Sequence, residues 1–205
     1  MQTGQKFWFI VRVTLVSILF SVAFNKPVFS QSSPDQPYDV YLPLIASGYL
    51  PLPAIQNGDF EQGDNGDWTV YSSGNYFLVT DDWLPLTPHS GNWLAWMGGA
   101  PDEDSRISQG VTLPAGGPVY LRYYYQVDSQ KTSCTEDWMY FLVGTTQLAS
   151  LRLCQASDTT DWEVGTVNLS AFTGQTITVT FQVTTSLTGN GSGFFIDDVS
   201  LVRSP

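Results

Sequence analysis

From about residue 55 to the end of the chain, short apolar or alternating runs are separated by Gly, Asn, Asp and Pro. In TITVTFQVT, at 176–184, Thr and Gln alternate with Ile, Val and Phe, which is the period-two pattern of a half-buried strand. The same criterion predicts strands at 68–71, 76–80, 93–97, 106–113, 119–128, 137–143, 147–154, 163–169, 176–184 and 194–202. No segment of ten or more residues has the period of an amphipathic helix. About ten strands in about 150 residues therefore predict an all-β fold, a jelly-roll β-sandwich of antiparallel strands.

The first 54 residues have a different character. Lys6 and Arg12 precede an apolar or small run at 13–24, and Ser30 ends VFS, which offers small residues for cleavage. This pattern predicts a secretory signal peptide at 1–30, because the run is shorter than the roughly 20 residues of a membrane span. Residues 31–54 are rich in Pro and Ser and predict a tether. We therefore expect a secreted protein with no membrane span, whose β-sandwich occupies residues 55–205.

The charge balance limits the choice of partners. Removal of residues 1–30 leaves five Lys and Arg against 19 Asp and Glu. Such an excess of acids repels phosphate groups, so nucleic acid and anionic membrane surfaces are poor partners. The acids can serve solubility, cation binding or both.

The two cysteines, Cys134 and Cys154, lie symmetrically about Gly144 in a hairpin pattern, DWMYFLV-GTT-QLASLRL. If the hairpin loop has an odd number of residues, both cysteines point to one face and form a disulfide in an oxidising compartment. A loop with an even number would place them on opposite faces and argue against the bond. A zinc or redox role is less favoured, because there is no CxxC motif and His89 is the only histidine.

The closing segment, SGFFIDDVSLV at 192–202, places acids in an otherwise apolar strand. Strict alternation puts Asp197 on the more apolar face and Asp198 on the other. A buried, unpaired carboxylate costs several kcal/mol. If the first and last strands are adjacent, NGDFEQG at 57–63 brings Asp59 and Glu61 to the same place, where oxygen ligands would favour Ca²⁺. The alternative is that these acids are ordinary surface charges.

Several motifs occur together in a familiar order. NGDFEQG followed by Trp68, then SGNWLAW, then a Trp before VNLSAFTGQTITVTFQV, and finally FFIDDVSL resemble the jelly-roll carbohydrate-binding modules attached to bacterial xylanases and glucanases. The broader galactose-binding-like and MAM-type sandwiches share this pattern, and the resemblance covers about residues 55–203. It implies that Trp68 and Trp162 belong to the core. It also implies a structural Ca²⁺ held by the Asp59 carbonyl, the Glu61 side chain, carbonyls near Ser90 and Trp93, and the Asp197 side chain.

Aromatic side chains can stack on the apolar face of a sugar while nearby polar groups bind its hydroxyls. The predicted strands at 119–128 and 137–143 each have a non-core face, and if they are neighbours they form one platform from Arg122, Tyr124, Gln126, Trp138 and Tyr140. Trp83, in the loop VTDDWLPLTPHSGNW, is the other candidate ligand-binding residue. The alternatives are a covered or Tyr-rich solvent face for the platform, and a core role for Trp83.

These patterns favour a secreted, non-catalytic carbohydrate-binding module whose partner is a polysaccharide or other glycan. The alternative is an extracellular adhesion or protein-interaction domain on the same sandwich. A glycoside hydrolase is less favoured: it needs two carboxylates facing each other across a cleft, and neither an alternating acid pattern nor a G-x-S-x-G motif is present.

Overall fold

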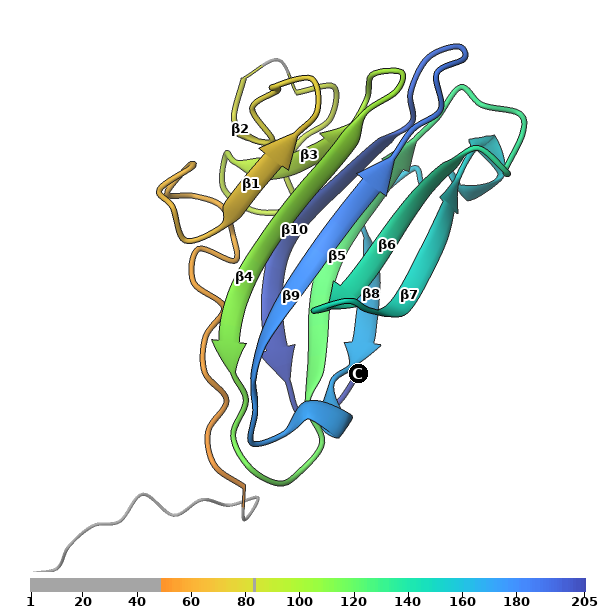
Figure 1. Cartoon of the computed structure of the whole chain (residues 1–205). Coiled ribbons are helices and arrows are strands. Elements are labelled where there is room, and N and C mark those ends of the chain that lie inside the picture. Colours follow the sequence, from red (N-terminus) through yellow and green to blue (C-terminus); the bar gives the residue numbers. More distant parts are fainter. Residues whose placement is uncertain (1–48, 83) are drawn as a thin grey trace, which may run out of the picture. The chain divides into compact units, whose positions relative to one another are not determined.

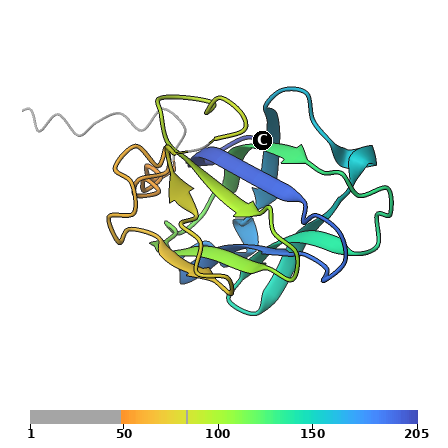
Figure 2. The same cartoon turned by 90° about the horizontal axis from the view of Figure 1, so that it is seen from above.

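The chain folds into two five-stranded antiparallel sheets that pack face to face (Figures 1 and 2). The computed structural model describes residues 49–82 and 84–205. The predicted signal peptide, most of the predicted tether, and Trp83 therefore lie outside the described residues. Sheet A has the order β1-β4-β9-β6-β7 and sheet B the order β2-β3-β10-β5-β8. The strands are β1 (Thr69–Ser72), β2 (Val79–Thr80), β3 (Leu94–Gly98), β4 (Asp104–Thr112), β5 (Tyr120–Asp128), β6 (Asp137–Val143), β7 (Thr146–Leu153), β8 (Glu163–Asn168), β9 (Thr176–Thr184) and β10 (Gly193–Val202).

All ten predicted strands are present, so the prediction of an all-β sandwich is confirmed. The strand bounds differ from the predicted ones by three residues at most, and β2 is the most shortened. Two short 3₁₀ helices, Gln155–Ser157 and Ser170–Phe172, lie in the connections on either side of β8. None of the helices in the described residues is long and apolar enough to cross a membrane.

The core fills the space between the sheets, and the alternation in β9 accounts for it. Ile177, Val179, Phe181 and Val183 are buried, whereas the intervening Thr and Gln residues face outward. The Phe181 ring of sheet A meets the Tyr123 ring of sheet B edge-on, with 4.8 Å between ring centroids. Alternation thus directs the apolar side chains of β9 into the interface, and aromatic contacts between the layers pack the two sheets together.

Trp68 and Trp162, both expected in the core, differ in burial. Trp68 is 3% exposed and donates its indole N–H to the Asn57 carbonyl at 2.9 Å, as the expected core position requires. Trp162 is only partly buried, so the expectation that it belongs to the core is wrong. Its indole N–H donates to the Thr87 carbonyl at 3.0 Å, and its ring meets His89 edge-on at 5.8 Å. Trp162 therefore anchors a loop on the outside of sheet B.

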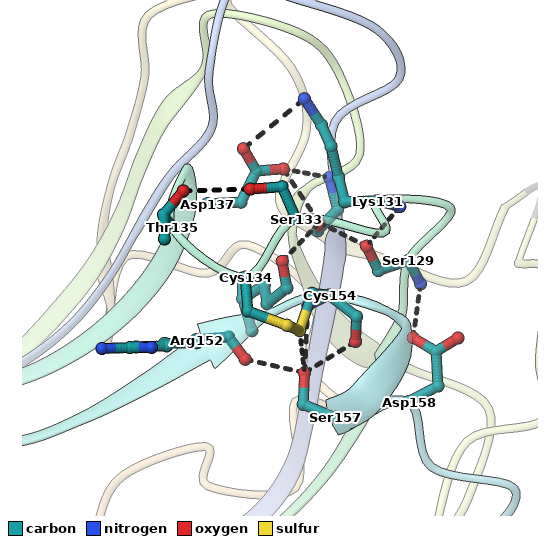
Figure 3. Close-up of a disulfide and its surroundings, with 12 residues drawn as sticks. Ser129, Lys131, Ser133, Cys134, Thr135, Asp137, Arg152, Cys154, Ser157 and Asp158 are labelled. Atoms are coloured by element: carbon teal, nitrogen blue, oxygen red, sulfur yellow. Dashed lines mark hydrogen bonds and ion pairs between the residues drawn. A yellow bond between two sulfur atoms is a disulfide. The ribbon is translucent and has the colours of Figure 1, made fainter.

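The β6–β7 hairpin has the strand register that a loop with an odd number of residues would give, although its loop has an even number. The loop contains only two residues, Gly144 and Thr145, which is an even number. A bulge next to Phe141 and Leu142 restores the register, so that Trp138 faces Arg152 and Tyr140 faces Ser150. Both cysteines consequently meet, and the predicted Cys134–Cys154 disulfide is confirmed, with a Cα–Cα distance of 5.0 Å (Figure 3).

The described part of the predicted tether lies against the domain. Residues 50–53 and 112–114 line a common groove, and the first described segment runs beside β4 in Figure 1. The Arg203 guanidinium lies 5.2 Å from the Tyr49 ring and donates to the Pro118 carbonyl. Further on, the Val199 N–H donates to the Gly58 carbonyl at 2.7 Å, which joins the segment before β1 to the last strand.

Candidate functional site

The outer face of sheet A carries a row of cross-strand partners that runs over all five strands. Each member pairs directly with the next, in the order Tyr71, Arg106, Gln182, Tyr140 and Ser150. A second row beside it contains Asp104, Thr184, Trp138 and Arg152. We refer to these nine residues as the sheet A platform. Three strand spacings of about 4.8 Å separate Tyr71 from Tyr140, so the platform is long enough for an oligosaccharide rather than a single sugar.

The platform has aromatic ends and a polar middle. The Trp138 and Tyr140 rings are nearly parallel, with 6.0 Å between centroids and 10° between planes. The Arg152 guanidinium lies 5.1 Å from the Trp138 ring, and the Arg106 guanidinium lies 5.4 Å from the Tyr71 ring. These cation–π contacts hold the aromatic side chains in place before any ligand arrives.

The polar middle is a connected network. The Asp104 carboxylate accepts from the Arg106 guanidinium and from the Gln182 amide, the latter at 2.8 Å. Both side chains keep further donors, because a guanidinium has five N–H groups and an amide has two. An elongated, hydroxyl-rich ligand could therefore stack on the aromatic ends and form hydrogen bonds at the middle.

The predicted single platform of five residues does not exist, because β5 and β6 belong to different sheets. β5 pairs with β10 and β8, whereas β6 pairs with β9 and β7. Trp138 and Tyr140 remain together on sheet A, but Arg122, Tyr124 and Gln126 lie on sheet B. The Tyr124 ring is stacked against His89 at 3.6 Å between centroids, so a loop residue covers it.

Tyr71, Arg106 and Gln182 are platform residues that the sequence interpretation missed. Their outward orientation follows from alternation within β1, β4 and β9. Their alignment with Tyr140 depends on the order and register of the strands, which no local pattern shows. In the sequence, 111 positions separate Tyr71 from Gln182.

Two carboxylates converge on the turn at 90–93. Asp197 is 0% exposed, and its two oxygens accept the Ser90 N–H at 3.1 Å and the Asp198 N–H at 2.7 Å. Glu61 accepts the N–H groups of Asn92 and Trp93, both at 2.7 Å, on one oxygen. The structure thus places Glu61 and Asp197 against the turn that contains Ser90 and Trp93, and their role as calcium ligands stays a prediction.

Asp197 is an unusual buried acid. Burial raises the pKa of its carboxyl to about 7, and the hydrogen bonds from Ser90 and Asp198 offset this only in part. Among the described residues it has no ion pair with a basic side chain. A cation held nearby would compensate for the burial of this charge.

Asp197 is buried as predicted, but not on the predicted face. Phe194, Ile196 and Val199 belong to the core, whereas Asp197 points to the loop that carries Ser90. A bulge between Asp197 and Ser200, with Asp198 in the left-handed region at φ 48°, changes the phase of the strand after Asp197, so that Val199 joins Phe194 and Ile196 in the core.

Asp198 does not face away from this loop, as strict alternation predicts. It accepts hydrogen bonds from the Ser90 hydroxyl at 2.9 Å and pairs with the His89 ring at 2.5 Å. The bulge therefore turns Asp198 towards 89–90, the side that Asp197 already faces, and a period-two pattern cannot anticipate this change.

A cation at this turn would have to be held partly by backbone oxygens. Within residues 49–82 and 84–205, no three His, Cys, Asp or Glu side chains gather as metal ligands. Only Glu61 and Asp197 contribute carboxylates, and the Asp59 side chain instead accepts the Glu61 N–H at 3.5 Å. A Ca²⁺ ion here would need carbonyl oxygens from Asp59 and from the turn near Ser90 and Trp93, which are hard ligands of the kind that Ca²⁺ accepts.

Comparison with solved structures identifies the class of fold. A family 61 carbohydrate-binding module in complex with β-1,4-galactotriose matches with a TM-score of 0.53 and 21% identity, over 76% of this chain and 98% of the module. The K1 adhesin domain of Lys-gingipain from Porphyromonas gingivalis matches with a TM-score of 0.54 and 13% identity, over 76% and 100% of the two chains. Its K3 adhesin domain gives 0.53 and 15%, over 73% and 99%.

At these identities the likeness shows a shared fold. The chain is a β-sandwich of the type seen in this carbohydrate-binding module and in these adhesin domains. No protein-family model matches the sequence. No curated protein matches it either.

Proposed function

We propose that the chain is a non-catalytic glycan-binding domain that binds an oligosaccharide on the sheet A platform. The observation that carries this proposal is the parallel Trp138–Tyr140 pair in register with Gln182 and Arg106. A pyranose offers an apolar face to such rings, and its hydroxyls match amide and guanidinium groups. The module of the same fold that was solved with β-1,4-galactotriose adds support for this class of ligand.

The charges on the platform favour binding rather than catalysis. Asp104 is occupied by Arg106 and Gln182, so it orients these two side chains instead of acting as a general acid. The single histidine is paired with Asp198 on the other sheet. We therefore infer a recognition surface with no hydrolytic machinery.

Trp138→Ala tests the proposed function. Titration with β-1,4-linked galacto-, xylo- and gluco-oligosaccharides should reveal a ligand whose affinity falls about tenfold or more in this variant, since a lost ring contact of about 1.4 kcal/mol corresponds to a factor of ten. The melting temperature should hardly change, because Trp138 lies outside the core. Trp162→Ala, on the other sheet, is the matched control and should keep full affinity. A large loss of stability in Trp138→Ala, or equal affinity of both variants, would contradict the proposal.

The alternative is an adhesion domain that binds a protein, and the platform chemistry argues against it. A protein-binding surface on this face would present a contiguous apolar patch. Here charged and amide groups separate the aromatic ends, and the exposed apolar side chains Phe77, Val164 and Leu187 lie on separate elements.

We also propose that a structural Ca²⁺ ion joins the first loop to the last strand through Glu61 and Asp197. The support is a fully buried carboxylate that lacks a basic partner and a second carboxylate bound to the same turn. Such an ion would supply positive charge at the turn, while Glu61 and Asp197 would hold the turn to both chain segments. Its role would be structural.

Secretion is the remaining part of the proposal. The disulfide between Cys134 and Cys154 supports an oxidising compartment, where such bonds persist. Together with the apolar run that precedes Ser30, it favours export and an extracellular site of action.

A further inference from the structure

A hollow lies at the β2 edge of sheet B, away from the sheet A platform. It encloses about 670 Å³, which is within the range of small-molecule sites, about 300–1,000 Å³. Its walls contain four aromatic side chains and three carboxylates: Tyr76, Phe77, Trp93, Trp96, Asp64, Asp81 and Asp82. We refer to this hollow as the edge pocket.

Trp96 forms a fixed wall of the edge pocket. It alternates with the core residues Ala95 and Met97, so its indole points out of sheet B. Phe195, which is 1% exposed, supports the indole from the neighbouring strand, with 5.3 Å between ring centroids. Gly99 has φ 77°, and a Cβ atom there would come within 2.9 Å of the indole nitrogen. A side chain at 99 would therefore displace the ring.

Tyr76 and Phe77 line the pocket from the turn after β1, and a buried carboxylate holds this turn. Glu103 is 3% exposed and accepts hydrogen bonds from the Ser73 hydroxyl at 2.8 Å and the Gly74 N–H at 2.9 Å. Phe77 itself is 89% exposed. A large aromatic side chain is thus presented to solvent at the pocket rim by a turn that is tied to the sheet.

The charge of the edge pocket selects among ligands. Asp64, Asp81 and Asp82 belong to its lining, and no Lys or Arg is among the described residues that line it. Among the described residues, these three carboxylates form no ion pair. Aromatic faces together with unpaired carboxylates favour an organic cation and disfavour an anion. The formal net charge of −11 adds to this preference.

We propose that the edge pocket binds a basic amino sugar, a pyranose that carries a protonated primary amine. The sugar ring would stack on Trp96 while its ammonium group lies among the carboxylates of Asp81 and Asp82. A neutral sugar would use the aromatic wall but leave the carboxylates without a partner. A lone lysine side chain is much smaller than the pocket and has no ring to stack. This inference concerns a site separate from the sheet A platform and does not depend on glycan binding there.

The test compares two trisaccharides by calorimetry on the whole chain at low salt. One is a β-1,4-linked glucosamine trimer, and the other is the N-acetylglucosamine trimer, which has the same ring but no charge. We expect the glucosamine trimer to bind at least tenfold more tightly. Asp81→Asn/Asp82→Asn should remove this preference without changing the fold, because both side chains are exposed. Trp96→Phe, which keeps a ring on Phe195, should weaken both trimers.

Controls separate this site from general attraction to an acidic protein. Asp161→Asn/Glu163→Gln removes two exposed charges near β8, at the opposite edge of sheet B, and should keep the preference. Trp138→Ala should also keep it, which distinguishes failure at the edge pocket from failure at the platform. Equal binding of the two trimers, equal loss in both double variants, or equally tight binding of trilysine would overturn the proposal.

Discussion

Asp137 and Asp197 are buried carboxylates that both fix β10. Asp137 binds the residue that precedes the strand, accepting the Ser192 N–H at 2.9 Å and the Ser192 hydroxyl at 2.8 Å. It also accepts the Ser186 N–H at 2.8 Å and lies 3.9 Å from the Lys131 ammonium (Figure 3). Asp137 thus has donors on every side, whereas Asp197 has two backbone N–H groups and no basic partner. The two sites differ in that a lysine supplies positive charge beside Asp137, whereas only backbone N–H groups face Asp197 among the described residues.

Asp137→Ala should destabilise the domain by about 3 kcal/mol, because it leaves the Ser192 and Ser186 donors and a largely buried Lys131 without their acceptor. Urea unfolding measured by tryptophan fluorescence would give this difference in the free energy of unfolding. Glu136→Ala is the matched control, since Glu136 also pairs with Lys131 but is solvent-exposed. If the two variants lose the same stability, the buried network does not hold β10.

The sequence predicts that Asp197 is buried, but it cannot predict the side to which the carboxylate points. The neighbouring apolar residues indicate burial, because Phe194, Phe195 and Ile196 precede it and Val199 follows two positions later. Asp197 alternates with the core residues Phe194 and Ile196, and the left-handed Asp198 then shifts the register by one residue, so that Val199 and not Asp197 joins them in the core. FFIDDVSL does not mark a bulge, since Asp tolerates the left-handed region but, unlike Gly, does not by itself indicate it.

At the scale of elements, the β6–β7 hairpin shows how a bulge can produce the predicted register despite a loop of the wrong length. Local alternation correctly places Met139 and Phe141 in the core and Trp138 and Tyr140 outside. The two-residue turn alone would have reversed this arrangement on β7. The extra residue on β7, Leu148, lies opposite Phe141 and Leu142, restores the arrangement and lets the disulfide close.

Replacing Cys134 and Cys154 together by Ser should lower the free energy of unfolding by about 3 kcal/mol, the value expected for release of a loop with a sequence separation of 20. Urea denaturation of the oxidised protein and the double variant measures this difference. Mass spectrometry of the unreduced protein, purified from an oxidising compartment, provides the independent check, and two free thiols in it would contradict the bond.

The pairing of strands is the element-scale feature that the sequence does not reveal. β6 lies next to β9 rather than β5, although β5 precedes it directly in the chain. The connection from β5 to β6 crosses from one sheet to the other, and it has no distinct local signal. The candidate platform therefore depended on an adjacency that only the folded chain decides, and for this reason Arg122, Tyr124 and Gln126 were wrongly combined with Trp138 and Tyr140.

At the scale of the whole molecule, the two sheets present three features with different chemistry, two of which share Trp93 on sheet B. Sheet A presents an extended aromatic and polar platform, and sheet B presents the edge pocket beside Trp96. The turn at 90–93 lies on the sheet B side, where Glu61 and Asp197 bind it. Because Asp197 belongs to the last strand and Glu61 precedes the first, a cation at this turn would affect the stability of the entire sandwich.

Calcium binding should therefore raise the melting temperature of the whole domain. An ion that binds only the folded state adds about 2.7 kcal/mol at a hundredfold excess over its Kd, so a chelator should lower the melting temperature. Added Ca²⁺ should restore it, and Mg²⁺ should do so poorly because it resists dehydration into an irregular cage.

Asp197→Ala and Glu61→Ala should each abolish the calcium dependence. Asp198→Ala should keep it, since Asp198 binds His89 and the Ser90 hydroxyl, although the loop it holds will be looser. A melting temperature that does not change when chelator is added, or a calcium response that is unchanged in Asp197→Ala, would rule out this ion.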